Sequence, residues 1–361
     1  MQVRLGDHLD FSNGRGAPQR GSRGRYRVYG ANGAIGYAPE CNAVGPLIVV
    51  GRVGSYCGSV HFCDSGIWAT ENALVCRPKN PDETRYWYYA LQTCRLNEHR
   101  AGSGQPLLTQ RVLREIVVWA VAANERRRIG ELLGAVDDKI AANRRVIDAA
   151  EALMVATVES LGDYVPLCSL ASRSSAVLEP EEFDDMVAHF SFSAFDDGAC
   201  PELVDSRSVK SAKFLLPAPC VLVSKLNPQI PRIWDILGMP DEMALASTEF
   251  VVLRPLDVDT SALWSALRQP RVLETLRQRV AGTSRSRQRI QPRDLMEIPV
   301  RDVRRLAPES ARAVADLGAL CHARRGECRR LSAFRDALLP RLMSGAVRVA
   351  DALGQAWTGN P

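Results

Sequence analysis

The sequence predicts a mixed α/β (α+β) protein in which two tandem pseudo-repeated domains are separated by long, antiparallel, coiled-coil-like helices. Three observations predict this class: 361 residues are more than one hydrophobic core usually serves, the chain contains an internal repeat, and two long stretches follow a heptad pattern. We expect domains over residues 1–123 and 164–307, helices over 124–163 and 308–345, and a C-terminal tail over 346–361.

The internal repeat consists of four blocks that occur in the same order in each half. The second block is a strand of buried type that ends in a small, a basic and an apolar residue. The matched pairs are residues 3–5 and 165–167, 46–53 and 219–226, 70–78 and 248–255, and 101–118 and 281–300. Four matches in one order predict two copies of one fold.

Each half is followed by a stretch with apolar residues at heptad positions, which predicts a coiled-coil seam. The first stretch carries Ile129, Val136, Asn143, Ala150 and Thr157, with Leu133, Ile140, Ile147, Met154 and Leu161 between them. The second begins at Pro308, passes through Val314, Leu317, Cys321, Cys328, Leu331, Leu338 and Leu342, and stops near Ser344-Gly345. Polar members such as Asn143 and Arg335 predict that more than two helices meet along the seam. The alternative is that both are ordinary core helices.

The charge of the chain is unevenly distributed. The net charge is +5, and 41 of the 46 basic residues are arginine, which suits phosphates and base edges but is also what a GC-rich genome would produce. Residues 268–305 hold eleven arginines against four acids, whereas residues 174–206 hold nine acids and no lysine or arginine. This contrast predicts one face that binds an anion and another that avoids it.

The sequence contains none of the catalytic motifs considered below in complete form. A base-flipping methyltransferase loop needs Asn-Pro-Pro-aromatic, and residues 227–230 read Asn-Pro-Gln-Ile. Asp137-Asp138-Lys139 resembles part of a nuclease site but falls on the heptad stretch, where a solvated charge cluster is expected. His61 and Cys63 lack metal-ligand spacing, and residues 86–89 (Tyr-Trp-Tyr-Tyr) favour a buried helix over base stacking. We therefore expect no catalytic residues, metal or cofactor.

The longest apolar run, residues 116–123, is too short to span a bilayer, and ten cysteines occur without a Cys-x-x-Cys pair. Buried thiols are the expectation, and both observations predict a cytoplasmic protein with no membrane contact.

The chain resembles the specificity subunits of type I restriction-modification systems. The residues that carry the resemblance are 29–37 (Tyr-Gly-Ala-Asn-Gly-Ala-Ile-Gly-Tyr), 51–55 (Gly-Arg-Val-Gly-Ser), 102–107 (Gly-Ser-Gly-Gln-Pro-Leu) and 334–345 (Phe-Arg-Asp-Ala-Leu-Leu-Pro-Arg-Leu-Met-Ser-Gly). The resemblance implies two target-recognition domains, each reading half of a split double-stranded DNA site, spaced by helices that bind two methyltransferase subunits, with restriction subunits as further partners. Residues 194–198 (Ala-Phe-Asp-Asp-Gly) replace the glycine-rich segment in the second half, so the halves should read different sequences.

Polar loop and strand-end residues are the candidate DNA contacts. They are Asn32, Arg52, Ser103, Gln105, Thr109, Arg111, Lys225, Arg285, Arg287, Arg289 and Arg293. For Asn32 a turn-holding role, for Arg52 and Lys225 a salt bridge, and for the loops a solvated face are the competing readings.

The candidate partner-binding residues lie on the heptad stretches: Leu133, Val136, Ile140, Asn143, Ile147, Met154, Leu317, Leu331, Leu338 and Leu342. A non-catalytic scaffold that binds nucleic acid without sequence preference is the alternative function, and an inactive relative of a nuclease is a variant of it. A specific DNA binder prefers one duplex by several kcal/mol, roughly 4–10, which a scaffold does not.

Overall fold

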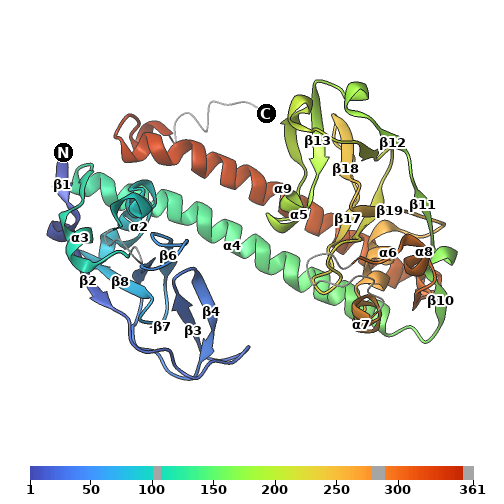
Figure 1. The fold of residues 1–361 in the computed structure, drawn as a ribbon, viewed down its shortest axis with the longest axis horizontal. Helices are drawn as coiled ribbons and strands as arrows, with labels where there is room; N and C mark the ends of the chain where they lie inside the picture. The colour runs from blue at the N-terminus through green and yellow to red at the C-terminus, as the bar shows by residue number, and fades with distance from the viewer. Residues whose placement is uncertain (101–106, 279–288, 353–361) are drawn as a thin grey trace. The chain divides into compact units, whose positions relative to one another are not determined.

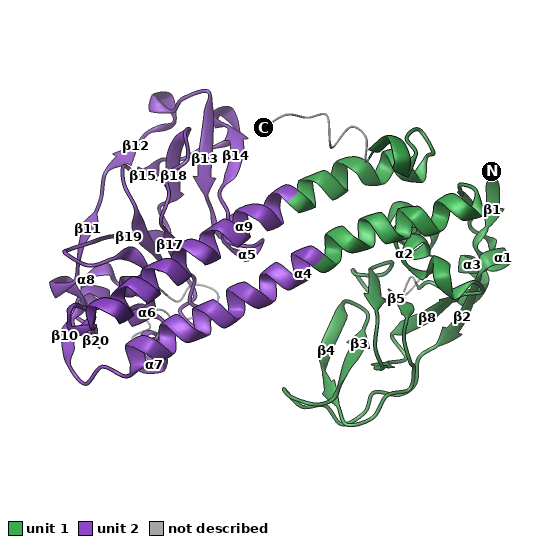
Figure 2. Ribbon diagram, turned by 180° about the vertical axis from the view of Figure 1, so that it is seen from behind, with its two compact units in different colours: residues 1–138, 331–361 green, residues 139–330 purple. Residues whose placement is uncertain are grey.

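The computed structural model describes residues 1–100, 107–278 and 289–352. The chain divides into two compact units, unit 1 with residues 1–138 and 331–361 and unit 2 with residues 139–330 (Figure 2). Two long helices, α4 (Ala123–Glu159) and α9 (Pro308–Met343), contribute residues to both units (Figure 1). Because the unit boundary cuts through these helices, it differs from the expected domain boundaries. The assignment of residues 1–123 and 164–307 as recognition domains stays a prediction.

Unit 1 begins with short strands and ends its globular part with a short helix and strand. Its elements before α4 are β1 (Gln2–Arg4), α1 (Leu5–His8), β2 (Leu9–Asn13), β3 (Tyr26–Gly30), β4 (Gly33–Ala38), β5 (Leu47–Gly51), β6 (Val60–Cys63), β7 (Ile67–Ala69), β8 (Ala73–Pro78), α2 (Thr84–Thr93), α3 (Gln110–Glu115) and β9 (Val117–Trp119). The strands form sheets with the orders β2-β8-β5-β6, β4-β3-β7 and β1-β9.

Unit 2 repeats this plan with additional strands. Its elements between α4 and α9 are β10 (Tyr164–Pro166), β11 (Ala171–Ser174), β12 (Val177–Leu178), β13 (Met186–Phe190), α5 (Phe192–Asp196), β14 (Glu202–Asp205), β15 (Lys213–Leu215), β16 (Cys220–Ser224), β17 (Ile233–Ile236), β18 (Met243–Ser247), β19 (Phe250–Pro255), α6 (Thr260–Leu267), α7 (Pro270–Gln278), α8 (Pro292–Met296) and β20 (Pro299–Arg301). The sheet orders are β11-β19-β16-β17, β12-β15-β18-β13-β14 and β10-β20.

The two units share one topology, which confirms the predicted mixed α/β class with pseudo-repeated halves. The sheet β2-β8-β5-β6 corresponds to β11-β19-β16-β17, and the parallel pair β3·β7 corresponds to β13·β18. The entry strand of each unit pairs with its exit strand, β1 with β9 and β10 with β20. Even single backbone hydrogen bonds recur, since Leu5 N donates to Ile116 O at 2.9 Å and Leu167 N donates to Ile298 O at 3.0 Å.

The strands β5 and β16 are buried on both faces, which explains why their sequences are continuous apolar runs. In β5, Ile48 and Val50 belong to one hydrophobic cluster, while Leu47 and Val49 belong to another. In β16, Val221 and Val223 face one cluster, and Cys220 and Leu222 face a second. Because side chains of a strand alternate between its faces, a strand between two cores needs apolar residues at every position.

The predicted heptad seam of α4 is buried from Ile129 to Met154, whereas Thr157 is half-buried and Leu161 lies beyond the end of the helix at Glu159. Ile129, Leu133, Ile140 and Met154 are each no more than 4% exposed, and Asn143 is 2% exposed. In unit 1 this face packs with Leu338 and Leu342 of α9 and with aromatic residues of α2. In unit 2 the sulfhydryl groups of Cys321 and Cys328 approach the carbonyl oxygens of Ile147 and Ile140. The later residue of α9, Cys328, contacts the earlier residue of α4, Ile140, so the two helices run antiparallel within unit 2.

A third helix packs against the long helices in each unit, in agreement with the expectation that more than two helices meet there. In unit 1 this helix is α2, whose Tyr86, Trp87 and Tyr89 are at most 1% exposed. The aromatic run 86–89 is thus part of a buried helix, as predicted. In unit 2 it is α6: a Cβ added at Gly318 of α9 would lie 1.9 Å from Ser261 Oγ, so close approach of α6 requires glycine there.

Both ends of α9 agree with the sequence prediction. The helix begins at Pro308, where the missing N–H costs nothing, and ends at Met343. Gly345 follows with a φ of 75°, and its N–H donates to Leu342 O at 3.1 Å. This left-handed residue satisfies a terminal carbonyl and stops the helix.

Candidate nucleic-acid interface

The end of strand β5 positions Arg52. Its backbone N–H donates to Asn72 O at 3.1 Å, and its carbonyl accepts from Leu108 N at 2.9 Å. The guanidinium reaches Asn13 Oδ1 at 3.4 Å, while its Nε is buried and has no hydrogen-bond partner among the described residues. Arg52 makes no ion pair in the described part of the chain. The described residues therefore do not support the competing reading of a salt bridge, and the role of Arg52 as an anion contact stays a prediction.

The glycine-rich hairpin between β3 and β4 lies against the turn that carries Arg52. Ser59 Oγ donates to Ala31 O at 2.7 Å, and a Cβ added at Gly51 would lie 2.0 Å from that same carbonyl. Only glycine at position 51 allows this approach. Gly33 has a φ of 83°, which closes the hairpin and leaves Asn32 exposed at its tip. The fold of unit 1 thus brings together two segments, 29–37 and 51–55, that are separate in the sequence.

Thr109 and Arg111 lie at the start of α3. The hydroxyl of Thr109 accepts from Val112 N at 3.2 Å and so caps the helix, which gives this residue a structural role. Arg111 is exposed in the first turn, next to the capped end.

Lys225 occupies in unit 2 the place that Arg52 has in unit 1. Its N–H donates to Glu249 O at 2.8 Å, and its carbonyl accepts from Ile290 N at 3.0 Å. The ammonium lies 5.7 Å from the centroid of the Phe214 ring. Burial lowers the pKa of Lys225, while the nearby Glu249 carboxylate acts in the opposite direction. The backbone positions are equivalent, but the electrostatic surroundings are not.

A carboxylate distinguishes this edge of unit 2. Arg289 forms an ion pair with Glu249 at 3.0 Å, and this contact raises the pKa of Arg289. The corresponding residue of unit 1 is the neutral Asn72, because Asn72 precedes β8 as Glu249 precedes β19. An anion that approaches Arg289 must therefore compete with Glu249. Arg293 is exposed on α8.

Four of the candidate DNA contacts, Ser103, Gln105, Arg285 and Arg287, lie outside the described residues. Their role stays a prediction. Residues 194–198, which replace the glycine-rich hairpin in unit 2, are described: residues 194–196 belong to α5, and Asp196 pairs with Arg232 at 2.7 Å. The two units therefore differ at the position where unit 1 presents Asn32.

The candidate partner-binding residues are mostly occupied by contacts within the chain. Leu133, Val136, Ile140, Asn143, Ile147, Met154, Leu338 and Leu342 are buried, while Leu317 and Leu331 are half-buried. The exposed faces of α4 and α9, which include Val146, Leu153 and Phe334, remain free for another protein. Whether any of these residues binds a partner stays a prediction.

The triplet Asp137-Asp138-Lys139 is a charge cluster on α4 in which Asp138 and Lys139 are exposed, as predicted, and all three residues form ion pairs. Asp137 pairs with Arg335 at 2.7 Å and Asp138 with Arg85 at 2.8 Å, while Lys139 lies 3.4 Å from Glu327. Within the described ranges, no group of three or more His, Cys, Asp or Glu side chains is arranged to hold a metal ion. None of the helices described is both long and apolar enough to cross a membrane.

Unit 1 has a further basic segment, residues 14–25 between β2 and β3, which we call the arginine segment. The internal repeat does not indicate it. The segment carries Arg15, Arg20, Arg23 and Arg25, all exposed. A signal for it exists in the sequence, since no acidic residue occurs between Asp10 and Glu40. The second half of the chain has no segment of like charge at the equivalent place, so the matched blocks of the repeat do not include the arginine segment.

Comparison with known proteins finds a similarity for the first part of the chain. Residues 1–152 match the family model described as the type I restriction modification DNA specificity domain. This part of the chain is therefore similar to a type I restriction modification DNA specificity domain. This confirms the resemblance found in the sequence, and the matched residues include β1 to β9 and most of α4.

The type I restriction enzyme EcoprrI specificity subunit of Escherichia coli is 25% identical to this chain over 174 residues. The match covers 48% of this chain and 42% of that subunit, so the chain spans less than half of this relative's length. The fold also resembles the crystal structure of a type I restriction-modification system S subunit from M. genitalium, with a TM-score of 0.59 and 17% identity over 95% of this chain and 96% of that chain. The residues that match the specificity-domain model thus lie within a chain whose fold is similar to that of this S subunit.

Proposed function

We propose that this chain is the DNA sequence-recognition subunit of a type I restriction-modification complex in the cytoplasm. The observation that supports the proposal is the pair of topologically equivalent units, together with the similarity of residues 1–152 to a type I restriction modification DNA specificity domain. In this proposal each unit reads one half of a bipartite target in double-stranded DNA. The chain has no active site of its own and acts by binding.

The proposed mechanism separates holding from reading. Arg52 and Lys225 follow equivalent buried strands, so they suit DNA phosphates, which are the same in every sequence. Base reading falls to segments that differ between the units, which are the Asn32 hairpin in unit 1 and the loops around Gln105 and Arg287. An Asn side chain at a hairpin tip has the donor and acceptor that an adenine edge requires.

The partners in this proposal are two methyltransferase subunits and, where present, restriction subunits. The exposed faces of α4 and α9 support partner binding, because their other faces are already buried within the chain. The bound chain would position the methyltransferase subunits for transfer of a methyl group to adenine within the target.

Genome-wide mapping of methylated adenine tests the proposal. The host is compared with and without this chain, and with the chain restored. We expect one split sequence motif to be methylated only when the chain is present. An unchanged methylation map would overturn the proposal and favour a scaffold without sequence preference.

A further inference from the structure

The arginine segment of unit 1 concentrates positive charge on an exposed surface. Its four arginines are exposed, and none of them forms an ion pair with the described residues. Arg27 adds a fifth positive charge just beyond the segment, and Asp10 and Glu40 are the nearest acids in the sequence on either side. Like charges at this density repel one another unless an anion lies among them.

Backbone hydrogen bonds hold the segment against the sheet β4-β3-β7. Arg15 N donates to Ala69 O at 2.9 Å, and Gly21 and Tyr37 exchange two hydrogen bonds of 3.0 and 3.1 Å. The Trp68 indole donates to Gly16 O at 3.1 Å. A segment held at three points presents its side chains from a fixed backbone, so little ordering entropy is lost when a ligand binds.

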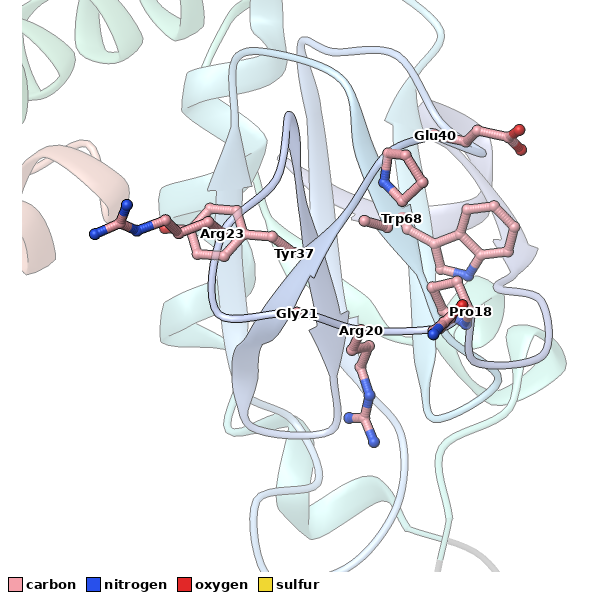
Figure 3. Close-up of a pocket in the computed structure, with 10 residues that line it drawn as sticks. Pro18, Arg20, Gly21, Arg23, Tyr37, Glu40 and Trp68 are labelled. Atoms are coloured by element: carbon pink, nitrogen blue, oxygen red, sulfur yellow. The ribbon is translucent and has the colours of Figure 1, made fainter.

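The fixed segment borders a pocket whose lining includes Arg20, Arg23, Tyr37 and Trp68, with Glu40 at its far side (Figure 3). Figure 3 shows that the guanidinium groups of Arg20 and Arg23 project outward in different directions instead of toward Glu40. Two separated cations on one surface suit a ligand with repeated negative charges.

The sheet that supports the arginine segment also carries the Asn32 hairpin, because β3 and β4 flank that turn. The segment is therefore continuous with the candidate interface of unit 1. Continuity with this interface favours the nucleic-acid backbone over an acidic protein as the occupant.

The equivalent connection in unit 2 has the opposite charge. Between β11 and β13 the chain carries Glu179, Glu181, Glu182, Asp184 and Asp185 and no lysine or arginine. A phosphate backbone would be repelled from this connection. The two units are thus equivalent in topology but not in their electrostatic contribution.

We propose that the arginine segment binds the phosphate backbone of duplex DNA without reading its sequence, and that unit 1 thereby supplies more of the salt-dependent affinity than unit 2. This inference rests on the proposed function for its ligand. Each phosphate neutralised by a basic side chain adds about 0.9 to the slope of log affinity against log salt.

The test compares two double variants of the full chain, each of which removes two positive charges. Arg20→Gln with Arg23→Gln alters the arginine segment, while Arg144→Gln with Arg145→Gln alters exposed residues of α4. All four side chains are exposed, and an unchanged melting temperature verifies the fold. Affinity for a duplex is measured by fluorescence anisotropy between about 50 and 200 mM salt.

We expect the segment variant to lose roughly two units of salt slope and to weaken binding equally for target and non-target duplexes. The α4 variant should keep the wild-type slope. An unchanged slope in the segment variant, or a loss confined to one base sequence, would overturn the inference. The salt slope of binding to a non-target duplex tests the arginine segment by itself. Failure of the proposed function would give a different result, a wild-type chain that binds all duplexes with equal affinity.

Discussion

At the scale of single residues, the two units differ most where their backbones agree best. Arg52 and Lys225 make backbone hydrogen bonds at equivalent positions, but the residue that accepts from the backbone N–H is Asn72 in unit 1 and Glu249 in unit 2. Glu249 already pairs with Arg289 at 3.0 Å. Unit 2 therefore holds an internal anion beside its two candidate phosphate contacts.

Removal of this internal anion should strengthen DNA binding. In Glu249→Gln, a DNA phosphate no longer competes with a carboxylate for Arg289 and Lys225. We therefore expect roughly two- to fivefold tighter DNA binding and a steeper salt dependence. The control is Glu131→Gln, which removes the same charge from the exposed pair with Arg127 on α4. Weaker binding by Glu249→Gln in a titration with one duplex would show that Glu249 orients Arg289 for DNA instead of occupying it.

Asp235 gives unit 2 a pH-dependent stability. Its Oδ2 accepts from Ser261 Oγ at 2.6 Å, but its Oδ1 is shielded from solvent without a partner among the described residues. Burial raises the pKa of Asp235 from 3.8 to about 6. The folded state therefore binds a proton more readily than the unfolded state between these values, and ionisation at higher pH costs stability.

Asp235→Asn should remove this cost. We expect the variant to gain stability relative to the wild type as the pH rises from about 5 to about 8, because only the wild type ionises over that range. Urea unfolding of both proteins at the two pH values measures the difference. A difference that stays constant with pH would contradict the raised pKa.

At the scale of elements, the sequence predicts the features that repeat or have a period. The buried strands 47–51 and 220–224, the seam of α4 and both ends of α9 follow from apolar periodicity and from proline and glycine. The arginine segment was not predicted from the repeat, because its charge is reversed in the second half. The pairing of Glu249 with Arg289 joins residues distant in the sequence, so no local pattern indicates it.

A buried ion pair fixes the first turn of α4 to the rest of unit 1. Arg126 and Glu83 lie 3.3 Å apart, and each side chain is only 6% exposed. Glu83 also accepts from the Trp87 indole at 2.9 Å, and Arg126 Nε donates to Val121 O at 2.9 Å. The ion pair therefore joins α4, α2 and the short connection between β9 and α4 that contains Val121.

Glu83→Gln should destabilise unit 1 by about 3 kcal/mol, because it leaves the Arg126 charge buried and unpaired. On α4, the helix that carries Arg126, Glu131→Gln breaks an exposed ion pair with Arg127 and should change the stability little. Urea denaturation of the two variants checks this. Equal effects would indicate that burial does not strengthen the Arg126–Glu83 pair.

At the scale of the whole molecule, the two units have the same topology but differ in the segments that connect their strands. The shared part comprises the central sheet, the entry and exit strands and the strand-end positions of Arg52 and Lys225. The differing parts are the Asn32 hairpin against α5, and the arginine segment against its acidic counterpart. Shared scaffolds with different reading segments are what a protein that reads two unlike half-sites requires.

Selection from a library of random DNA duplexes tests the central claim most directly. The full chain is used to enrich bound duplexes at a fixed salt concentration, and the enriched pool is sequenced. The account predicts two short conserved blocks of different sequence, separated by a gap of constant length in which all bases are tolerated. A pool without any conserved block, or with one continuous block, would contradict it.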